Sequence, residues 1–384
     1  MVKGYLYIEI DKSQSAKHLG EICGDVIEFD RNKFSTTVIL CDGLGSGIKA
    51  NIAANMCAAR MKQLLRSGFS LRKAFTNIAS TMTEAVKDDL PFSAFSVMRI
   101  LSDGTTSILT YEMPPPLFLS NRCSVILPQR NAPLKNGLIS ESNCVLKAGD
   151  SVLIMSDGIT QAGLGKGLPL GWTIEGANKY VNECLANGIL PKDIPEHVRH
   201  KAKEIWKEKP EDDCTVIAAT SRPGRVMNIF TGPPKDEKSD PAIVKKFINS
   251  EGLKIVCGAS TAKIVARELN KELNINDNFS SFISPPDYSI DGIDLVTEGA
   301  VTLNQVYNIW DEDPQRFEKN NPAADLYALL TVVDKVNFII GTSQNPANAD
   351  ITFRQMGILD RKKILELLTR KLEESGKLVV TEYV

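Results

Sequence analysis

Carboxylates stand at four points of the chain where an extended segment begins or ends beside glycine or another acidic residue. They are Asp25, Asp42, Asp157 and the pair Asp212-Asp213. Oxygen-only ligand sets suit hard cations such as magnesium and manganese. Several aspartates around one point repel one another unless cations stand between them. If the fold brings these sites together, they can hold two cations, which activate a bridging water and clamp a phosphoryl group.

The stretch around Asp42 combines a strand with a glycine loop. Residues 36–40 are a β-branched, apolar run of strand type, and the run ends at Asp42. Glycines at positions 43, 45 and 47 follow, and a helical pattern starts at Ile48. A carboxylate at the end of a buried strand, beside backbone that a ligand can approach closely, can hold either a metal or a phosphate. The loop alone does not decide between these two ligands.

The other acidic sites have related settings. Asp157-Gly158 ends an apolar strand over residues 151–156, as Asp42-Gly43 does. A polar turn at 30–33 predicts a hairpin that brings Asp25 close to Asp42, although Asp25 also fits an ordinary turn after glycine. Asp212-Asp213 opens a buried strand instead of closing one.

Composition limits the classes of function. A chain of 384 residues predicts two domains, and a net charge of -2 gives no field that favours nucleic acid or an anionic membrane. No secretion signal and no apolar run near ~18 residues is present. The eight cysteines are dispersed without a Cys-x-x-Cys pair, and there are only three histidines. We therefore expect a cytoplasmic protein in which carboxylates do any metal binding.

Two helices follow the glycine loop. Their apolar stripes are Ile48, Ile52, Ala53, Met56, Ala59 and Leu64, then Leu71, Ala74, Phe75, Ile78, Ala79, Met82 and Val86. We expect a helical hairpin whose two stripes pack on a sheet as core. Strands over residues 92–127 come next, interrupted by the bend Met113-Pro114-Pro115-Pro116, and helices are predicted near 174–187 and 194–207.

As an ordered set, four motifs resemble the metal-dependent serine/threonine protein phosphatases (PPM) of the bacterial SpoIIE branch. They are Gly24-Asp25, Asp42-Gly43-Leu44-Gly45-Ser46-Gly47, Gly149-Asp150 with Ser156-Asp157-Gly158, and Asp212-Asp213-Cys214-Thr215. The resemblance covers about residues 1–222. It implies an α/β fold of the α/β/β/α sandwich type, with a two-metal site between the sheet edges.

The resemblance also implies roles for individual residues. Asp25, Asp42, Asp157 and Asp212 would act in catalysis through two bound divalent cations, Mn²⁺ or Mg²⁺. Asp42 would bridge the ions, Gly43 would offer its backbone carbonyl, and Asp213 is a ligand or lies just behind one. The implied reaction is hydrolysis of phosphoserine or phosphothreonine on a bacterial signalling protein through a metal-activated water. The expected substrate is an anti-sigma-antagonist-type regulator, and a homodimer is compatible with this prediction.

Some features depart from the family pattern or leave alternatives. The branch often carries a Gly-His-Pro-Pro-like turn where this chain has Glu112-Met113-Pro114-Pro115, so the histidine is missing. No arginine that clamps the substrate phosphate can be identified. Residues 48–87 resemble a regulatory switch of the branch. The alternatives are a non-catalytic pseudophosphatase that binds a partner, or an ATPase of the histidine-kinase type.

A second unit is predicted after a linker at 221–225. Strands and helices alternate over residues 226–384, which indicates a smaller α/β domain. Because this domain is appended to a unit that resembles a phosphatase, a sensory or regulatory role is the expectation for it. Gly258-Ala259-Ser260-Thr261 lies where a strand meets a helix and suits either an anion or an ordinary helix cap. Asp294, Glu298 and Gly299 are expected to face the same crevice.

Overall fold

The computed structural model describes ten ranges of the chain: 5–18, 20–45, 47–87, 92–120, 122–134, 137–207, 209–276, 287–313, 321–343 and 357–384. The chain divides into two compact units, Met1–Pro223 and Gly224–Val384. Within the described ranges, no helix has the length and apolar character needed to cross a membrane.

The first unit contains two antiparallel sheets. The five-stranded sheet has the order β1 (Leu6–Ser15), β11 (Cys214–Pro223), β10 (Ser151–Met155), β6 (Leu117–Ser120) and β7 (Cys123–Ile126). The six-stranded sheet has the order β2 (Asp25–Arg31), β3 (Ser35–Gly43), β4 (Ser93–Leu101), β5 (Thr105–Tyr111), β9 (Gly137–Val145) and β8 (Arg130–Leu134). The predicted bend at 113–116 is where the chain leaves one sheet for the other.

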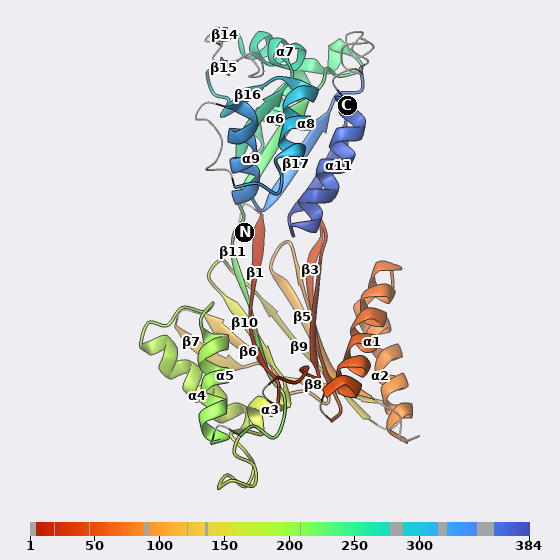
Figure 1. Ribbon diagram of the computed structural model, residues 1–384, viewed down its shortest axis with the longest axis vertical. Coiled ribbons are helices and arrows are strands. Elements are labelled where there is room, and N and C mark those ends of the chain that lie inside the picture. Colours follow the sequence, from red (N-terminus) through yellow and green to blue (C-terminus); the bar gives the residue numbers. More distant parts are fainter. Residues whose placement is uncertain are drawn as a thin grey trace. The chain divides into compact units, whose positions relative to one another are not determined.

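Three apolar layers hold this unit together. Side chains such as Leu40, Ile154 and Ile217 pack between the two sheets. Helices α1 (Gly47–Arg66) and α2 (Leu71–Lys87) cover the outer face of the six-stranded sheet. The outer face of the five-stranded sheet is covered by α3 (Asp157–Thr160), α4 (Thr173–Ala186) and α5 (Ile194–Ile205). The predicted α/β/β/α sandwich is thereby confirmed (Figure 1).

Helix α1 corrects one expectation from the sequence. Ile48, Ile52 and Met56 were expected in the core, but they are 63%, 53% and 68% exposed. The buried face of α1 consists mainly of small residues, namely Ala50, Ala53, Ala54, Cys57, Ala58 and Met61. The helix lies so close to β3 that a Cβ added to Gly43 would stand 2.0 Å from the carbonyl oxygen of Ala50. Larger side chains therefore cannot turn inward near this end of α1. In α2 the expected face is buried, from Leu71 to Ala79.

The second unit is built on a seven-stranded sheet. Its order is β14 (Leu273–Asn276), β15 (Asp287–Ile290), β16 (Leu295–Thr297), β13 (Leu253–Cys257), β12 (Val226–Thr231), β17 (Lys335–Ile340) and β18 (Leu378–Tyr383). The strands from β16 to β18 are all parallel. Counted along the chain, these five lie in the order 3-2-1-4-5, which is a doubly wound arrangement.

Helices cover both faces of this second sheet. On one face lie α6 (Asp240–Asn249) and α7 (Ala259–Leu269), and on the other lie α8 (Gly299–Asn308), α9 (Pro322–Val332) and α11 (Arg361–Glu374). A short 3-10 helix, η1 (Glu237–Ser239), precedes α6. The predicted α/β character is confirmed. The sequence patterns did not reveal α9 and β18.

Candidate metal centre

The hairpin of β2 and β3 places two aspartates directly opposite each other. Asp25 pairs with Asp42 in the antiparallel register, as the polar turn at 30–33 predicted. Both side chains are buried, with 3% and 9% of their surfaces exposed. This position lies at the end of β3, where Gly43 meets α1. Two carboxylates of this kind are expensive to bury unless something compensates their charge.

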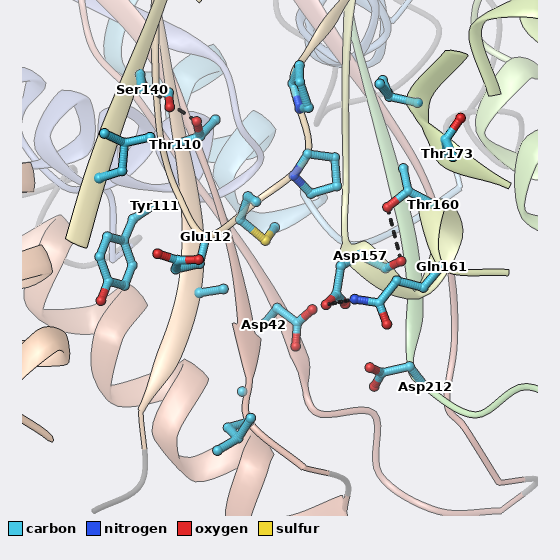
Figure 2. A pocket seen from close by; sticks show the side chains of 18 of the residues that line it. Asp42, Thr110, Tyr111, Glu112, Ser140, Asp157, Thr160, Gln161, Thr173 and Asp212 are labelled. Atoms are coloured by element: carbon cyan, nitrogen blue, oxygen red, sulfur yellow. Dashed lines mark hydrogen bonds between the residues drawn. The ribbon is translucent and has the colours of Figure 1, made fainter. Parts of the chain in front are cut away.

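The five-stranded sheet supplies the other two aspartates. Asp157 begins α3 directly after β10, and Asp212 precedes β11. A Cβ on Gly158 would stand 2.1 Å from the backbone oxygen of Asp213, so the two segments cross in close contact. Figure 2 shows the carboxylates of Asp42, Asp157 and Asp212 pointing toward one another from the two sheets.

Asp157 has an orienting partner that the sequence did not single out. The side-chain amide of Gln161 donates a hydrogen bond of 2.7 Å to Oδ2 of Asp157 (Figure 2). The two residues are four apart, with Asp157 at the first position of α3 and Gln161 at its C-cap, a spacing that places side chains on one face. That spacing was the available signal. Oδ1 of Asp157 is buried and has no hydrogen-bond partner.

Asp42, Asp157 and Asp212 line one cavity of about 980 Å³, whereas Asp25, which pairs with Asp42, is not among the lining residues. Its walls also include the loop at Gly43-Leu44-Gly45, the β5–β6 connection and the start of α4. Five lining residues are acidic: Asp42, Glu112, Asp157, Glu175 and Asp212. Among the described residues that line the cavity, none is lysine, arginine or histidine. The described part of the chain therefore offers no cationic side chain here to an anionic substrate.

The carboxylates shift one another's protonation. Burial raises the pKa of Asp25 to about 7, and the charges of Asp213 and Asp212 add to this, against the nearby hydroxyls of Thr215 and Ser156. Neither hydroxyl forms a hydrogen bond with Asp25, whose two carboxylate oxygens are buried without a partner.

The same causes act on the facing residues. Burial raises the pKa of Asp42 well above its usual range, and Asp25, Asp157 and Asp212 raise it further. Burial, followed by the charge of Asp157, raises the pKa of Asp212 to about 6. Raised pKa values and unpartnered oxygens are the properties expected of carboxyl groups that serve as metal ligands when no cation is bound.

The residues therefore fit hard divalent cations in type and charge. As the side chains stand, no three His, Cys, Asp or Glu residues within the described ranges form a group that could hold a metal ion. Magnesium usually keeps several waters and takes only one or two carboxylates directly. A site of that kind requires fewer direct protein ligands than a closed cage.

Asp213 differs from its neighbour in its contacts. Its Oδ1 accepts a hydrogen bond of 2.6 Å from the backbone of Lys17, and its Oδ2 accepts one of 2.7 Å from that of Gly24. Its side chain is buried, and these bonds fasten the β1–β2 connection beside Asp25. Both carboxylate oxygens of Asp213 are therefore already engaged by backbone amides.

The missing histidine of the Gly-His-Pro-Pro-like turn has a structural counterpart. Met113 is buried among the apolar side chains between the two sheets. The preceding Glu112 has a φ of 54°, in the left-handed region that favours glycine, and its exposed side chain lines the cavity. Met113 therefore stands at the histidine position of the turn, and Glu112, at the glycine position, contributes an acidic side chain to the cavity.

Comparison with known proteins follows this geometry. Residues 32–222 match the family described as stage II sporulation protein E (SpoIIE). The first unit belongs to the SpoIIE branch of PPM-type phosphatases. A relative from Priestia megaterium, the stage II sporulation protein E, is 24% identical over 226 residues, covering 56% of this chain and 37% of the relative. The protein of the same name from Bacillus subtilis is 26% identical over 156 residues, covering 38% of this chain and 18% of the relative.

The chain spans well under half the length of these SpoIIE relatives. A solved structure of the PP2C phosphatase domain with a fragment of the regulatory domain of SpoIIE from Bacillus subtilis is 19% identical, with a TM-score of 0.49. The aligned part covers 57% of this chain and 63% of the chain in that structure. The family match spans β3 to β11, which include three of the four acidic sites, and Asp25 lies just before it.

The raised pKa values predict how a cation-free SpoIIE-type unit responds to pH. The folded pKa of Asp25 is about 7 and its unfolded value is 3.8. Between these values the folded state holds a proton that the unfolded state has released, so stability falls as pH rises. For Asp25 alone the loss amounts to roughly 4 kcal/mol at full effect. We expect the melting temperature in excess chelator to decrease from pH 5 to pH 8.

Manganese should reverse this trend, because a cation replaces the proton between the carboxylates. Thermal melts with and without Mn²⁺ across this pH range measure both effects. The Asp25→Asn variant is the control, since it should show a flatter pH profile and a smaller shift with manganese. A wild-type melting temperature that rises with pH in chelator would contradict this account.

Proposed function

We propose that the protein is a metal-dependent phosphatase that hydrolyses phosphoserine or phosphothreonine on a protein substrate. The observation that carries this proposal is the cavity around Asp42, which is lined by five acidic residues and by no described cationic side chain. A phosphate group is repelled by such a cavity unless cations are bound in it. The membership of this unit in the SpoIIE branch agrees with that reading.

Each acidic residue has a proposed task. Asp25, Asp42, Asp157 and Asp212 act in catalysis by holding the cations, and Asp42 has all three others as electrostatic neighbours. Asp42 is therefore the proposed bridge between two ions. Gly43 follows it at the end of β3 and is proposed to offer its backbone carbonyl. Gln161 orients Asp157, and Asp213 fixes the backbone beside Asp25.

Two divalent cations, Mn²⁺ or Mg²⁺, supply a deprotonated water at neutral pH and offset the charge of the phosphoryl group. The chain supplies the remaining conditions. Burial of Asp25 and Asp42 keeps their carboxylates fixed before substrate arrives, which avoids reorganisation during the reaction. Glu112 and Glu175 place further negative charge on the cavity wall, which disfavours acidic residues beside the phosphorylated side chain.

The substrate is proposed from family membership. An anti-sigma-antagonist-type regulator, phosphorylated on serine, is the proposed partner. The exposed apolar residues Ile48, Ile52 and Met56 lie on α1, the helix that follows the glycine loop after Asp42. A regulatory role of helices α1 and α2 is therefore part of this proposal. The second unit is proposed as the sensory or regulatory part.

A metal titration tests the activity directly. The full chain, freed of metal, should hydrolyse p-nitrophenyl phosphate and a phosphoserine peptide only after manganese or magnesium is added. Full activity in excess chelator would overturn the proposal. Cation binding without hydrolysis of either substrate, or of the phosphorylated regulator, would instead support a pseudophosphatase. ATP binding by the first unit would support the ATPase alternative, which the family match disfavours.

A further inference from the structure

The second unit contains a cavity at the carboxyl ends of three parallel strands. It measures about 160 Å³ and is lined by the segments that follow β12, β13 and β16. A water molecule occupies about 30 Å³ in the liquid, so the cavity has room for a group several times larger. In doubly wound sheets, ligands bind outside this edge of the strands.

Two helices begin at this cavity. Helix α7 starts at Ala259 and α8 starts at Gly299, and the first residues of both line the wall. A Cβ on Gly258 would stand 3.7 Å from the Cα of Gly299, so the two helix starts lie side by side. Neither helix has a side-chain cap on its first turn. The free amides and the positive ends of both helices therefore face one small space, which favours an anion there.

A buried hydroxyl points independently to a ligand. Thr231 is fully buried, and its Oγ1 has no hydrogen-bond partner. Side chains alternate along β12, so Thr231 faces the same side as Ile229, the side covered by α8 and α11. Thr231 lines the cavity, and the first residues of α8 and α11 line it from that side. Such a hydroxyl is costly to leave unpaired, and a bound acceptor would satisfy it.

The charged side chains at the cavity narrow the class of ligand. Arg361 donates hydrogen bonds to the carbonyl oxygens of Gly341 and Ser343, which hold its guanidinium close to Gly232. Arg361 thus adds a positive charge at a fixed position. Glu298 also lines the cavity and adds a carboxylate. A carboxylate beside a phosphate site accepts hydrogen bonds from sugar hydroxyls.

We propose that this cavity binds the phosphate of a small molecule that also carries hydroxyl groups, such as a sugar phosphate or a ribonucleotide. The amides of α7 and α8, the hydroxyl of Thr231 and the guanidinium of Arg361 receive the phosphate, and Glu298 receives a hydroxyl. The segment after β12, Thr231-Gly232-Pro233-Pro234, lacks the G-x-G-x-x-G spacing of dinucleotide sites. The helix amides proposed to receive the phosphate therefore follow the second and third strands, while the first strand contributes Thr231.

Hydrogen exchange of the full chain tests the site. The measurement is made in excess chelator, so that phosphate is not drawn to the centre at Asp42. Probes are ribose 5-phosphate, AMP, inorganic phosphate and ribose. We expect ribose 5-phosphate or AMP to slow exchange at residues 259–262 and 299–302, inorganic phosphate to do so more weakly, and ribose not at all. Unchanged exchange with every phosphate probe, or slowing confined to residues 42–45, overturns the proposal.

Two matched pairs of variants sharpen the result. Ser260→Asp places a negative charge in the first turn of α7, where it suits the helix, and should weaken binding at least about tenfold. Ser260→Asn has the same shape without the charge and should bind like the wild type. Thr231→Val removes the unpartnered hydroxyl, whereas Thr302→Val removes another fully buried, unpartnered hydroxyl that does not line the cavity.

Only Thr231→Val of the second pair should weaken binding, by about 5- to 10-fold. Equal binding by Ser260→Asp and Ser260→Asn overturns the proposal even if Thr231→Val fails to fold.

Discussion

Replacing Asp42 with asparagine is expected to lower manganese-dependent phosphatase activity roughly 10²- to 10³-fold or more. This is the size of effect that the loss of one preorganised electrostatic group has on catalysis. Asp42 is the residue whose protonation responds to the three other acidic sites together. Its loss therefore weakens both proposed ion positions. The fold should survive, because asparagine keeps the size of the side chain and removes one of several mutually repelling charges.

The measurement is kcat/KM for p-nitrophenyl phosphate and a phosphoserine peptide over a manganese titration. Melting in chelator serves as the test of folding. Glu175→Gln is the matched control, because Glu175 lines the same cavity and is not among the residues that shift the pKa of Asp42. We expect this variant to retain activity within about threefold, since an exposed charge at the rim is worth little. Full activity in Asp42→Asn would contradict the bridging role, and an equal loss in both variants would indicate a general effect of charge.

Changing the adjacent residues Asp212 and Asp213 to asparagine is expected to affect different properties: stability in Asp213→Asn, and cation binding with hydrolysis in Asp212→Asn. Asp213→Asn should destabilise the first unit by about 3 kcal/mol. Each carboxylate oxygen of Asp213 accepts a hydrogen bond from a backbone N–H, and in the variant an NH₂ group, which cannot accept, replaces one of these oxygens. The affected donors are the amides of Lys17 and Gly24. Asp212→Asn should leave stability in chelator unchanged or higher, because the carboxyl of Asp212 is repelled by Asp157.

The loss of stability in Asp213→Asn is measured by urea unfolding in chelator and, separately, by hydrogen exchange of β11. Added manganese measures the effect of Asp212→Asn, since this variant should lose both the cation-induced stabilisation and the hydrolysis. Each variant is the control for the other, because the two positions are adjacent in the chain. The opposite pattern, with Asp213→Asn stable and inactive and Asp212→Asn unstable, would assign the ligand role to Asp213.

The helical hairpin shows where sequence patterns succeed and where they mislead. The stripe from Leu71 to Ala79 is buried as expected, because α2 has room for large side chains against the sheet. The stripe of Ile48, Ile52 and Met56 has the same period but faces solvent. Periodicity records which residues share a face, and it does not record how closely the helix approaches its sheet. At Gly43 that approach admits only small residues.

The cavity of the second unit shows a similar division. The strand-to-helix transition at Gly258 and its suitability for an anion were visible in the sequence, as was the expectation that Glu298 and Gly299 share the crevice. The third member of that expected set, Asp294, instead accepts a hydrogen bond from the backbone of Lys254 at the other end of β13. Thr231 and Arg361 lie far from these residues in the chain, so only the strand order brings them to the same cavity.

For the stretch from Asp42 to Gly47, the sequence by itself determined the strand, the glycine loop, the helix and the pairing with Asp25, because these depend on residue types and on a short polar turn. The resemblance of four ordered motifs determined the family. Only the tertiary structure decided that Asp157 and Asp212 face Asp42, that Asp213 is held by backbone amides, and that no described cationic side chain enters the cavity. These facts depend on contacts between two sheets whose residues are more than a hundred positions apart, and such contacts leave no periodic signal in the chain.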